Sequence, residues 1–125
     1  MNKRICGLKE DYWEYYHDNG NIRIKGNYIN DTREGYWEHY NYDGIIYSKG
    51  YYKNGIKNGY WEFYNTDGYI ISKFNYKNGE LNGYCETYYY DGCPYTKGFC
   101  LNNIKEGYWV EYHHNGKIER QEIYL

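Results

Sequence analysis

One short unit of 24 residues accounts for nearly the whole chain. Its clearest marker is a tryptophan that recurs at a fixed interval, with a cysteine in its place once. A fixed period of this length is typical of repeat architectures, in which similar units stack and bury a shared core. We therefore predict a single repeat domain over residues 1–125, in which residues 1–10 are the tail of an earlier unit. The marker positions are Trp13, Trp37, Trp61, Cys85 and Trp109, and the units start near residues 11, 35, 59, 83 and 107.

Each unit contains two turn signals. Asn-Gly and Asp-Gly dipeptides favour two-residue type I′ turns because both residues adopt positive φ readily. The runs between them are rich in Tyr, Trp and Ile, which favour strands. We predict an all-β, antiparallel meander of about ten short strands, built from about five stacked β-hairpins in an elongated twisted sheet, with one strand broken by Pro94. The first turns are Asn19-Gly20, Asp43-Gly44, Asp67-Gly68, Asp91-Gly92 and Asn115-Gly116; the second are Asn30-Asp31, Asn54-Gly55, Asn78-Gly79 and Asn102-Asn103.

The strand register follows from these turns. If Asp43-Gly44 is a two-residue loop, Tyr42 faces Ile45 and Glu38 faces Lys49. Opposite charges in facing positions stabilise a sheet by roughly 0.2–1 kcal/mol. The same register sets three of the marker positions opposite a glycine, where a large ring can cover the bare backbone. The equivalent pairs are Glu14–Lys25, Glu62–Lys73 and Glu86–Lys97 for the charges, and Trp13–Gly26, Trp37–Gly50 and Cys85–Gly98 for the ring positions.

Alternation along the strands assigns the residue columns to two faces. The first face is predicted to be the more buried one and carries the tryptophans together with an isoleucine and a tyrosine column. The second face carries the Glu and Lys columns between two further tyrosine columns. The members of the first face are Ile22, Ile46, Ile70 and Ile118 and Tyr28, Tyr52, Tyr76 and Tyr124; those of the second are Tyr12, Tyr36, Tyr60, Tyr84 and Tyr108 and Tyr16, Tyr40, Tyr64, Tyr88 and Tyr112.

Charge and hydropathy restrict the classes of partner. The net charge is -2 at pH 7, so the chain has no general attraction for nucleic acid or for an anionic membrane. No apolar run follows the first four residues, and we expect neither a signal peptide nor a membrane span. The expected location is the cytoplasm.

The residues that could carry chemistry do not converge in the sequence. His17, His39, His113 and His114 occupy different positions of the repeat, mostly near hairpin tips, so we predict no metal site. We find no nucleophile with a positioned base and no phosphate-binding loop, and we predict no catalytic residues, no cofactor and no enzymatic activity.

The cysteines have two interpretations. Cys85 and Cys100 fall on the same face of adjacent strands and could form a disulfide. In a cytoplasmic protein, buried free thiols are the favoured alternative.

The tyrosine-rich second face is the candidate recognition surface. Tyrosine offers a large contact area at a low entropic cost and is enriched at interfaces, although it is also simply a good strand former. We expect a protein partner and a chain that is a monomer or a weak homodimer. The alternative is a small ligand, such as a nucleotide or a sugar, which would need a closed pocket. The candidate partner-binding residues are Tyr36, Tyr40, Tyr60, Tyr64, Tyr84 and Tyr88.

The unit resembles the MORN repeat in its variant form, with a Gly-x-Trp-x-x-Tyr opening and a Tyr-x-Asn-Gly exit. The best segments are residues 35–40 and 52–55, and the resemblance covers nearly the whole chain. It implies stacked β-hairpins and a role as a scaffold or binding module. Bacterial members are often classed as antitoxins of toxin–antitoxin pairs, so the resemblance implies an antitoxin-like protein. For the ligand alternative, a phage protein that sequesters a signalling nucleotide would be one example.

Overall fold

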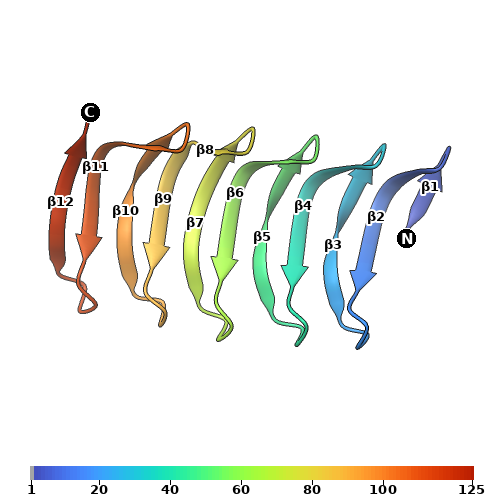
Figure 1. Cartoon of the computed structure of the whole chain (residues 1–125), viewed down its shortest axis with the longest axis horizontal. Coiled ribbons are helices and arrows are strands. Elements are labelled where there is room, and N and C mark those ends of the chain that lie inside the picture. Colours follow the sequence, from blue (N-terminus) through green and yellow to red (C-terminus); the bar gives the residue numbers. More distant parts are fainter. Residues whose placement is uncertain (1) are drawn as a thin grey trace.

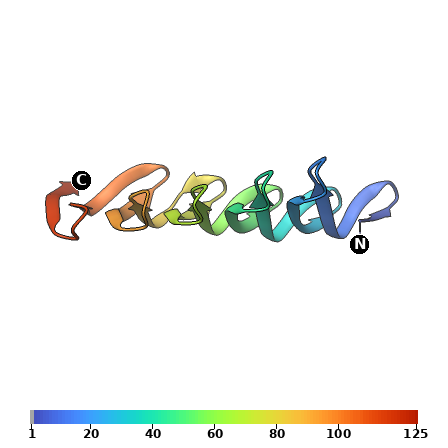
Figure 2. The ribbon, with the colours of Figure 1, turned by 90° about the horizontal axis from the view of Figure 1, so that it is seen from below.

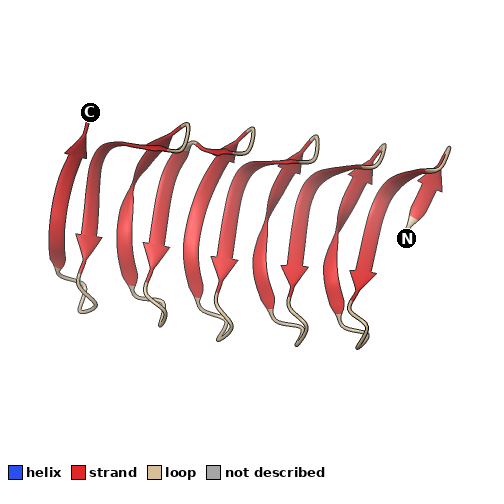
Figure 3. Cartoon of the chain, viewed as in Figure 1, coloured by secondary structure: helices blue, strands red, loops and turns tan. Residues whose placement is uncertain are grey.

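The computed structural model describes residues 2–125 as one antiparallel sheet in which neighbours in sequence are neighbours in space (Figures 1 and 3). Met1, the first residue of the predicted array, lies outside the described residues. The predicted all-β meander is confirmed. The strands are β1 (Lys3–Ile5), β2 (Leu8–Tyr16), β3 (Ile22–Ile29), β4 (Thr32–Tyr40), β5 (Ile46–Lys53), β6 (Ile56–Tyr64), β7 (Ile70–Lys77), β8 (Glu80–Leu81), β9 (Gly83–Tyr88), β10 (Pro94–Leu101), β11 (Ile104–Tyr112) and β12 (Ile118–Tyr124).

The sheet is a single elongated layer. Figure 2, turned from the first view, shows the hairpins one after another in a single row from the N-terminus to the C-terminus. The described part of the chain contains no helix that is long and apolar enough to cross a membrane. The prediction that Pro94 breaks a strand is wrong. Pro94 is the first residue of β10, where its missing N–H is tolerated.

The second turn of each unit has the predicted geometry. Asn54 and Gly55 have φ values of 53° and 79°, and Asn30 and Asp31 have values of 48° and 66°. Two consecutive positive φ angles are the mark of the type I′ turn. This turn therefore forms even where the glycine is replaced by Asp31.

The first turn differs from the prediction. Gly44 alone has a positive φ, and the backbone N–H of Asn41 donates to the carbonyl of Ile45 at 2.8 Å. The loop is therefore Tyr42-Asp43-Gly44, and Tyr42 does not face Ile45. The same loop forms where the position of Asn41 holds His17, Tyr89 or His113, so it belongs to the repeat. The side chain of Asn41 stabilises its own copy, because its oxygen accepts hydrogen bonds from the N–H groups of Asp43 and Ile45, each at 3.0 Å.

The predicted charge register is nevertheless correct. Glu38 faces Lys49, because a bulge that leaves Tyr47 unpaired compensates for the extra loop residue. The same bulge makes the predicted face of the isoleucine column wrong. Ile46 pairs with Tyr40, on the opposite face from the tryptophans, and Ile24 packs in the core instead of Ile22. The other three charge pairs are also confirmed: Glu14–Lys25, Glu62–Lys73 and Glu86–Lys97.

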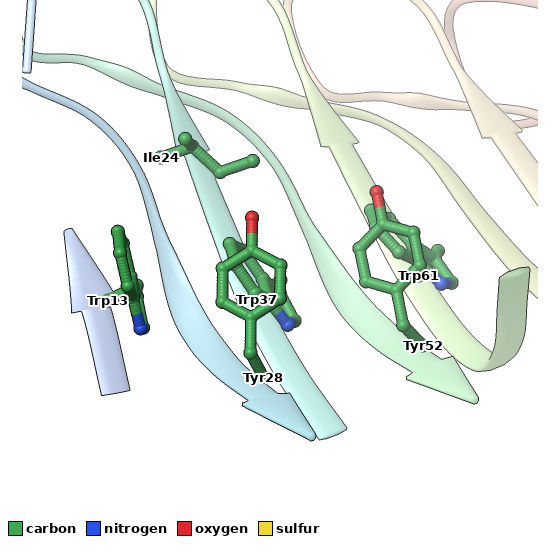
Figure 4. Packing of buried hydrophobic residues seen from close by; sticks show 6 residues of the cluster. All are labelled: Trp13, Ile24, Tyr28, Trp37, Tyr52 and Trp61. Carbon is green, nitrogen blue, oxygen red and sulfur yellow. The ribbon is translucent and has the colours of Figure 1, made fainter. Parts of the chain in front are cut away.

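The core lies on what we call the tryptophan face. Figure 4 shows tyrosine rings alternating with tryptophan rings along a row, and Trp37 and Trp61 are 0% and 1% exposed. Tyr52 stands edge-on between them, with ring centroids 6.2 Å and 5.0 Å away. This is the favoured geometry for aromatic pairs.

Trp37, Trp61 and Trp109 each cover the glycine of the preceding strand, whereas the strand before Trp13, β1, contains no glycine. A Cβ atom added to Gly50 would lie 2.2 Å from the ring of Trp61, and one added to Gly26 would lie 2.1 Å from that of Trp37. The Trp37–Gly50 register is as predicted, but the ring over Gly50 is that of Trp61. The indole N–H of Trp61 also donates to the carbonyl of Tyr51 at 2.8 Å, which satisfies its only donor.

Between the third and fourth units, the large residue and the small residue of the glycine–tryptophan pair change places. Cys85 stands where a tryptophan is expected, and Phe74 stands where the covered glycine is expected. Phe74 packs against the cluster of Cys85, Cys100 and Trp109. The phenyl ring therefore fills part of the space that an indole fills in the other units.

We predict that the exchange can be reversed only as a pair. Phe74→Gly should destabilise the chain by roughly 3–5 kcal/mol because it leaves a cavity, and Cys85→Trp by about 1–3 kcal/mol because it overpacks the core. The double variant rebuilds the Gly–Trp pair, so the two effects should fail to add by at least about 2 kcal/mol in urea denaturation. Phe99→Gly, on the other face, combined with Cys85→Trp is the control cycle and should be additive. If the free-energy changes of Phe74→Gly and Cys85→Trp add in the double variant, Phe74 does not take the place of the missing indole.

Candidate binding surfaces

The face opposite the tryptophans, here called the tyrosine face, is organised by glutamates. Tyr36, Glu38 and Tyr40 alternate along β4, so their side chains share this face. Both tyrosine hydroxyls donate to the Glu38 carboxylate, at 2.9 Å and 2.8 Å. Tyr60 and Tyr64 hold the carboxylate of Glu62 in the same way, at 2.9 Å and 2.8 Å.

Lysines complete this network between units. The ammonium of Lys25 lies 3.4 Å from Glu38, and that of Lys49 lies 3.5 Å from Glu62. Each lysine thus forms its ion pair with the glutamate of the following unit rather than with its predicted partner. Lys49 also lies 5.8 Å from the ring centroid of Tyr64, within the range of a cation–π contact. The network therefore joins successive hairpins laterally.

The pKa values follow these contacts. Burial alone would raise the pKa of Glu38, but hydrogen bonds from Tyr40 and Tyr36 and the charge of Lys25 outweigh it and lower that pKa. Burial, and then the bond to Glu38, raise the pKa of Tyr40 to about 12. At neutral pH the carboxylate is charged and the phenols are protonated.

The six candidate partner-binding tyrosines fall into two environments. Tyr36, Tyr60 and Tyr84 are 40%, 39% and 44% exposed, whereas Tyr40, Tyr64 and Tyr88 are partly buried. In Tyr36, Tyr40, Tyr60, Tyr64 and Tyr88 the hydroxyl donates to a glutamate, so the rings rather than the hydroxyls face a potential partner.

Cross-strand partners extend the exposed column beyond the predicted residues. Tyr51 faces Tyr36, with ring centroids 5.5 Å apart, Phe99 faces Tyr84, and all four are exposed. The strand register predicted from the sequence already places Tyr51 opposite Tyr36 and Phe99 opposite Tyr84, so the sequence contains the signal for these two residues. We call the resulting set the aromatic row: Tyr36, Tyr51, Tyr60, Tyr84, Phe99, Tyr108 and Ile123, which are 39–71% exposed.

The tryptophan face is covered by cations that the sequence analysis did not identify. The guanidinium of Arg33 lies 5.1 Å from the Trp37 ring and 5.4 Å from the Tyr52 ring. Lys57 lies 5.0 Å from the Trp61 ring. The signal was a basic residue four positions before each tryptophan, replaced by leucine in the fourth unit: Lys9, Arg33, Lys57, Leu81 and Lys105.

A cleft of about 440 Å³ opens on the tryptophan face at the fourth unit. Cys85 and Cys100 replace a tryptophan and a tyrosine of the repeat there, and both are buried and free. Burial, and then the neighbouring Cys100, raise the pKa of the Cys85 thiol to about 12. The other walls combine rings, cations and hydroxyls: Phe74, Trp109, Lys105, Arg120, Thr87 and Thr96.

The hairpin tips of the last two units bring three ligand-type side chains together. Atoms of Asp91, Cys93 and His114 lie within 4.8 Å of one another. The sequence analysis considered the histidines alone and missed this group, because stacking of tips places His114 beside Asp91. His39 lies away from this group, on the tryptophan face, with its ring centroid 6.0 Å from that of Trp61.

We predict that His39 makes stability depend on mild acid. Burial, and then the charges of Arg33 and Lys57, lower the pKa of His39 from 6.5 to about 4. A depressed folded-state pKa means that the neutral ring is favoured, so its contribution is complete above pH 6.5 and is lost as the pH falls towards 4. Urea denaturation at a series of pH values should show this loss, and His39→Gln should flatten it. His17→Gln controls for removing a histidine at a tip. An unchanged pH dependence in His39→Gln would disprove the assignment.

Comparisons with known proteins agree with this arrangement. No curated protein matches the chain. Three segments, residues 12–30, 33–54 and 105–125, match a family model. The interval between the second and third match contains Phe74, Cys85 and Cys100, where the unit departs from its own pattern. The model that these three segments match is that of the MORN repeat variant, and MORN repeats are generally linked to binding and scaffold roles.

Proposed function

We propose that this chain is a non-enzymatic scaffold that binds a protein partner through the tyrosine face. The observation that carries the proposal is the aromatic row, in which six rings and Ile123 are exposed on one face of the sheet, with Asn75 on β7 between Tyr60 and Tyr84. Exposed apolar surface of this kind marks interaction sites on soluble proteins. An antitoxin that covers a toxin would be one form of such a scaffold.

The shape of the row indicates what the partner offers. From Tyr36 on β4 to Ile123 on β12 the row crosses seven strand intervals, which at about 4.8 Å each gives a length of about 34 Å. A helix of about 22 residues has this length. We therefore infer a partner that lays an elongated apolar element across the strands.

The glutamate network supports this use of the face. Because Glu38 and Glu62 hold the hydroxyls of flanking tyrosines, the rings are fixed before a partner arrives. Side chains that are already ordered lose less conformational entropy on binding. Rigid aromatic anchors near the centre of an interface commonly dominate its binding energy.

We predict that Tyr60→Ser combined with Tyr64→Ser weakens partner binding at least tenfold, which corresponds to about 1.4 kcal/mol. The experiment has two steps. A photo-crosslinking amino acid at Tyr60 first captures the partner in cells, and the purified partner is then titrated against the double variant, with circular dichroism to verify the fold.

Tyr47 provides the matched control. It is 46% exposed, close to the 39% of Tyr60, but its ring lies 5.9 Å from that of His39 on the tryptophan face. A crosslinker at Tyr47 should capture nothing, and Tyr47→Ser should leave the affinity unchanged. Equal capture from both faces, or full affinity in a folded Tyr60/Tyr64 variant, would reject the tyrosine face.

The cleft at Cys85 favours a second candidate function, which is the binding of a small ligand. Its volume of about 440 Å³ lies within the usual range for ligand sites, and Phe74 and Trp109 offer rings against which a planar group could stack. Lys105 and Arg120 could meet a phosphate or carboxylate group. A nucleotide fits this combination better than an uncharged sugar.

We predict for this candidate that a nucleotide raises the melting temperature of the native chain and that Cys85→Trp abolishes the shift, because the indole fills the cleft. Thermal denaturation with a panel of nucleotides and sugars measures this. The Tyr60/Tyr64 variant should keep the shift. If no compound of the panel stabilises the native chain, the ligand candidate fails and the protein-partner proposal stands unaffected.

A further inference from the structure

We propose that Asp91, Cys93 and His114 form a zinc site that links the hairpin tips of the last two units. Their ligand atoms, a carboxylate oxygen, a thiol sulfur and an imidazole nitrogen, lie within 4.8 Å of one another. Cysteine, histidine and aspartate are the side chains that bind zinc in proteins. Ions that prefer oxygen alone, such as magnesium and calcium, do not suit a set with sulfur and nitrogen.

The geometry needs only small movements to accept the ion. Zinc lies about 2.0–2.3 Å from nitrogen, oxygen and sulfur ligands in a tetrahedron, which places neighbouring ligand atoms roughly 3.3–3.8 Å apart. Nε2 of His114 already lies 2.5 Å from Oδ2 of Asp91, and both side chains are exposed. Three protein ligands leave one position for water.

Neighbouring contacts hold the ligands in place. The backbone N–H of Cys93 donates to Oδ1 of Asp91 at 3.1 Å, which leaves Oδ2 directed at His114. The His114 ring packs against Tyr89 with centroids 5.1 Å apart, and the Tyr89 hydroxyl donates to the carbonyl of Tyr112 at 2.6 Å. The two tips are therefore already joined beside the ligand set. Such supporting contacts commonly strengthen metal sites.

The set is not a general property of the repeat. The positions equivalent to Cys93 hold Asn21, Ile45, Tyr69 and Lys117, and those equivalent to His114 hold Asp18, Tyr42, Thr66 and Tyr90. Both positions vary from unit to unit, and among these tips only this adjacent pair places a cysteine beside a histidine. The ligand set therefore belongs to these two tips and not to the repeat.

A zinc ion here would act as a clamp on the end of the array. Within residues 2–125, the hairpin of β11 and β12 has a neighbouring hairpin on one side only, and β12 is an edge strand. Terminal units of repeat proteins are the ones that open most easily, because they lack one stacking partner. An ion bound by both tips would stabilise the last hairpin by mass action, since the opened chain cannot supply all three ligands.

The test is titration of the reduced, metal-free full chain with zinc chloride, followed by calorimetry and by thermal denaturation. One ion per chain should bind, raise the melting temperature and release protons, because the thiol must be deprotonated. Cobalt(II) in place of zinc should give a thiolate-to-metal charge-transfer band. Cys93→Ser and His114→Gln should each weaken zinc binding at least tenfold, and Cys93→Ser should also remove the band.

Three matched variants keep the test specific. Cys6→Ser removes another exposed cysteine, His113→Gln removes the adjacent histidine, and Asp67→Asn changes the equivalent turn residue of the preceding tip. All three should bind zinc as the native chain does. Absence of binding at micromolar zinc, full binding by the Cys93 or His114 variant, or zinc uptake only through a metal-dependent dimer in light scattering would each overturn the site.

Discussion

The contact between a tryptophan ring and the bare backbone of a glycine is the interaction through which the units of this sheet bury their largest side chains. A single-layer sheet has no second layer in which to bury its side chains, so each unit has to use its neighbour. Trp61 does so by lying flat over Gly50 while its N–H satisfies the carbonyl of Tyr51 at a bulge. No other side chain could occupy the glycine position, because even a Cβ would clash with the ring. The tyrosines that stand between the rings, and the cations above them, depend on this first contact.

The two faces of the sheet use aromatic residues in different ways. On the tryptophan face the rings bury one another, and Arg33 and Lys57 cover them while keeping their charges in solvent. On the tyrosine face the rings stay partly exposed, and their hydroxyls are held by glutamates. The first arrangement supplies stability and the second supplies a rigid surface. This division explains how a chain with a mean hydropathy of -1.12 can form an ordered sheet.

Most of the fold could be predicted from turn chemistry and period, and the failures have local causes. The first turn was predicted one residue too short because an Asp-Gly dipeptide is compatible both with a two-residue loop and with the three-residue loop that closes from Asn41 to Ile45. A bulge at Tyr47 cancelled the error for the charge register but not for Ile46. The cleft could have been predicted from the joint replacements at Phe74, Cys85 and Cys100. The group around His114 could not, because it depends on how neighbouring tips stack.

The size exchange between Phe74 and Cys85 has a consequence for how such a chain can change its length. A whole unit that carries the glycine-and-tryptophan pair can be lost or duplicated without harm to its neighbours. If residues 35–58 were removed, Trp61 would come to lie over Gly26, which is the same contact as before. If residues 83–106 were removed, Trp109 would meet Phe74, and two large rings would compete for one space. The fourth unit therefore cannot be gained or lost separately from the third, and the C-terminal part of the array is fixed in number while the N-terminal part is modular.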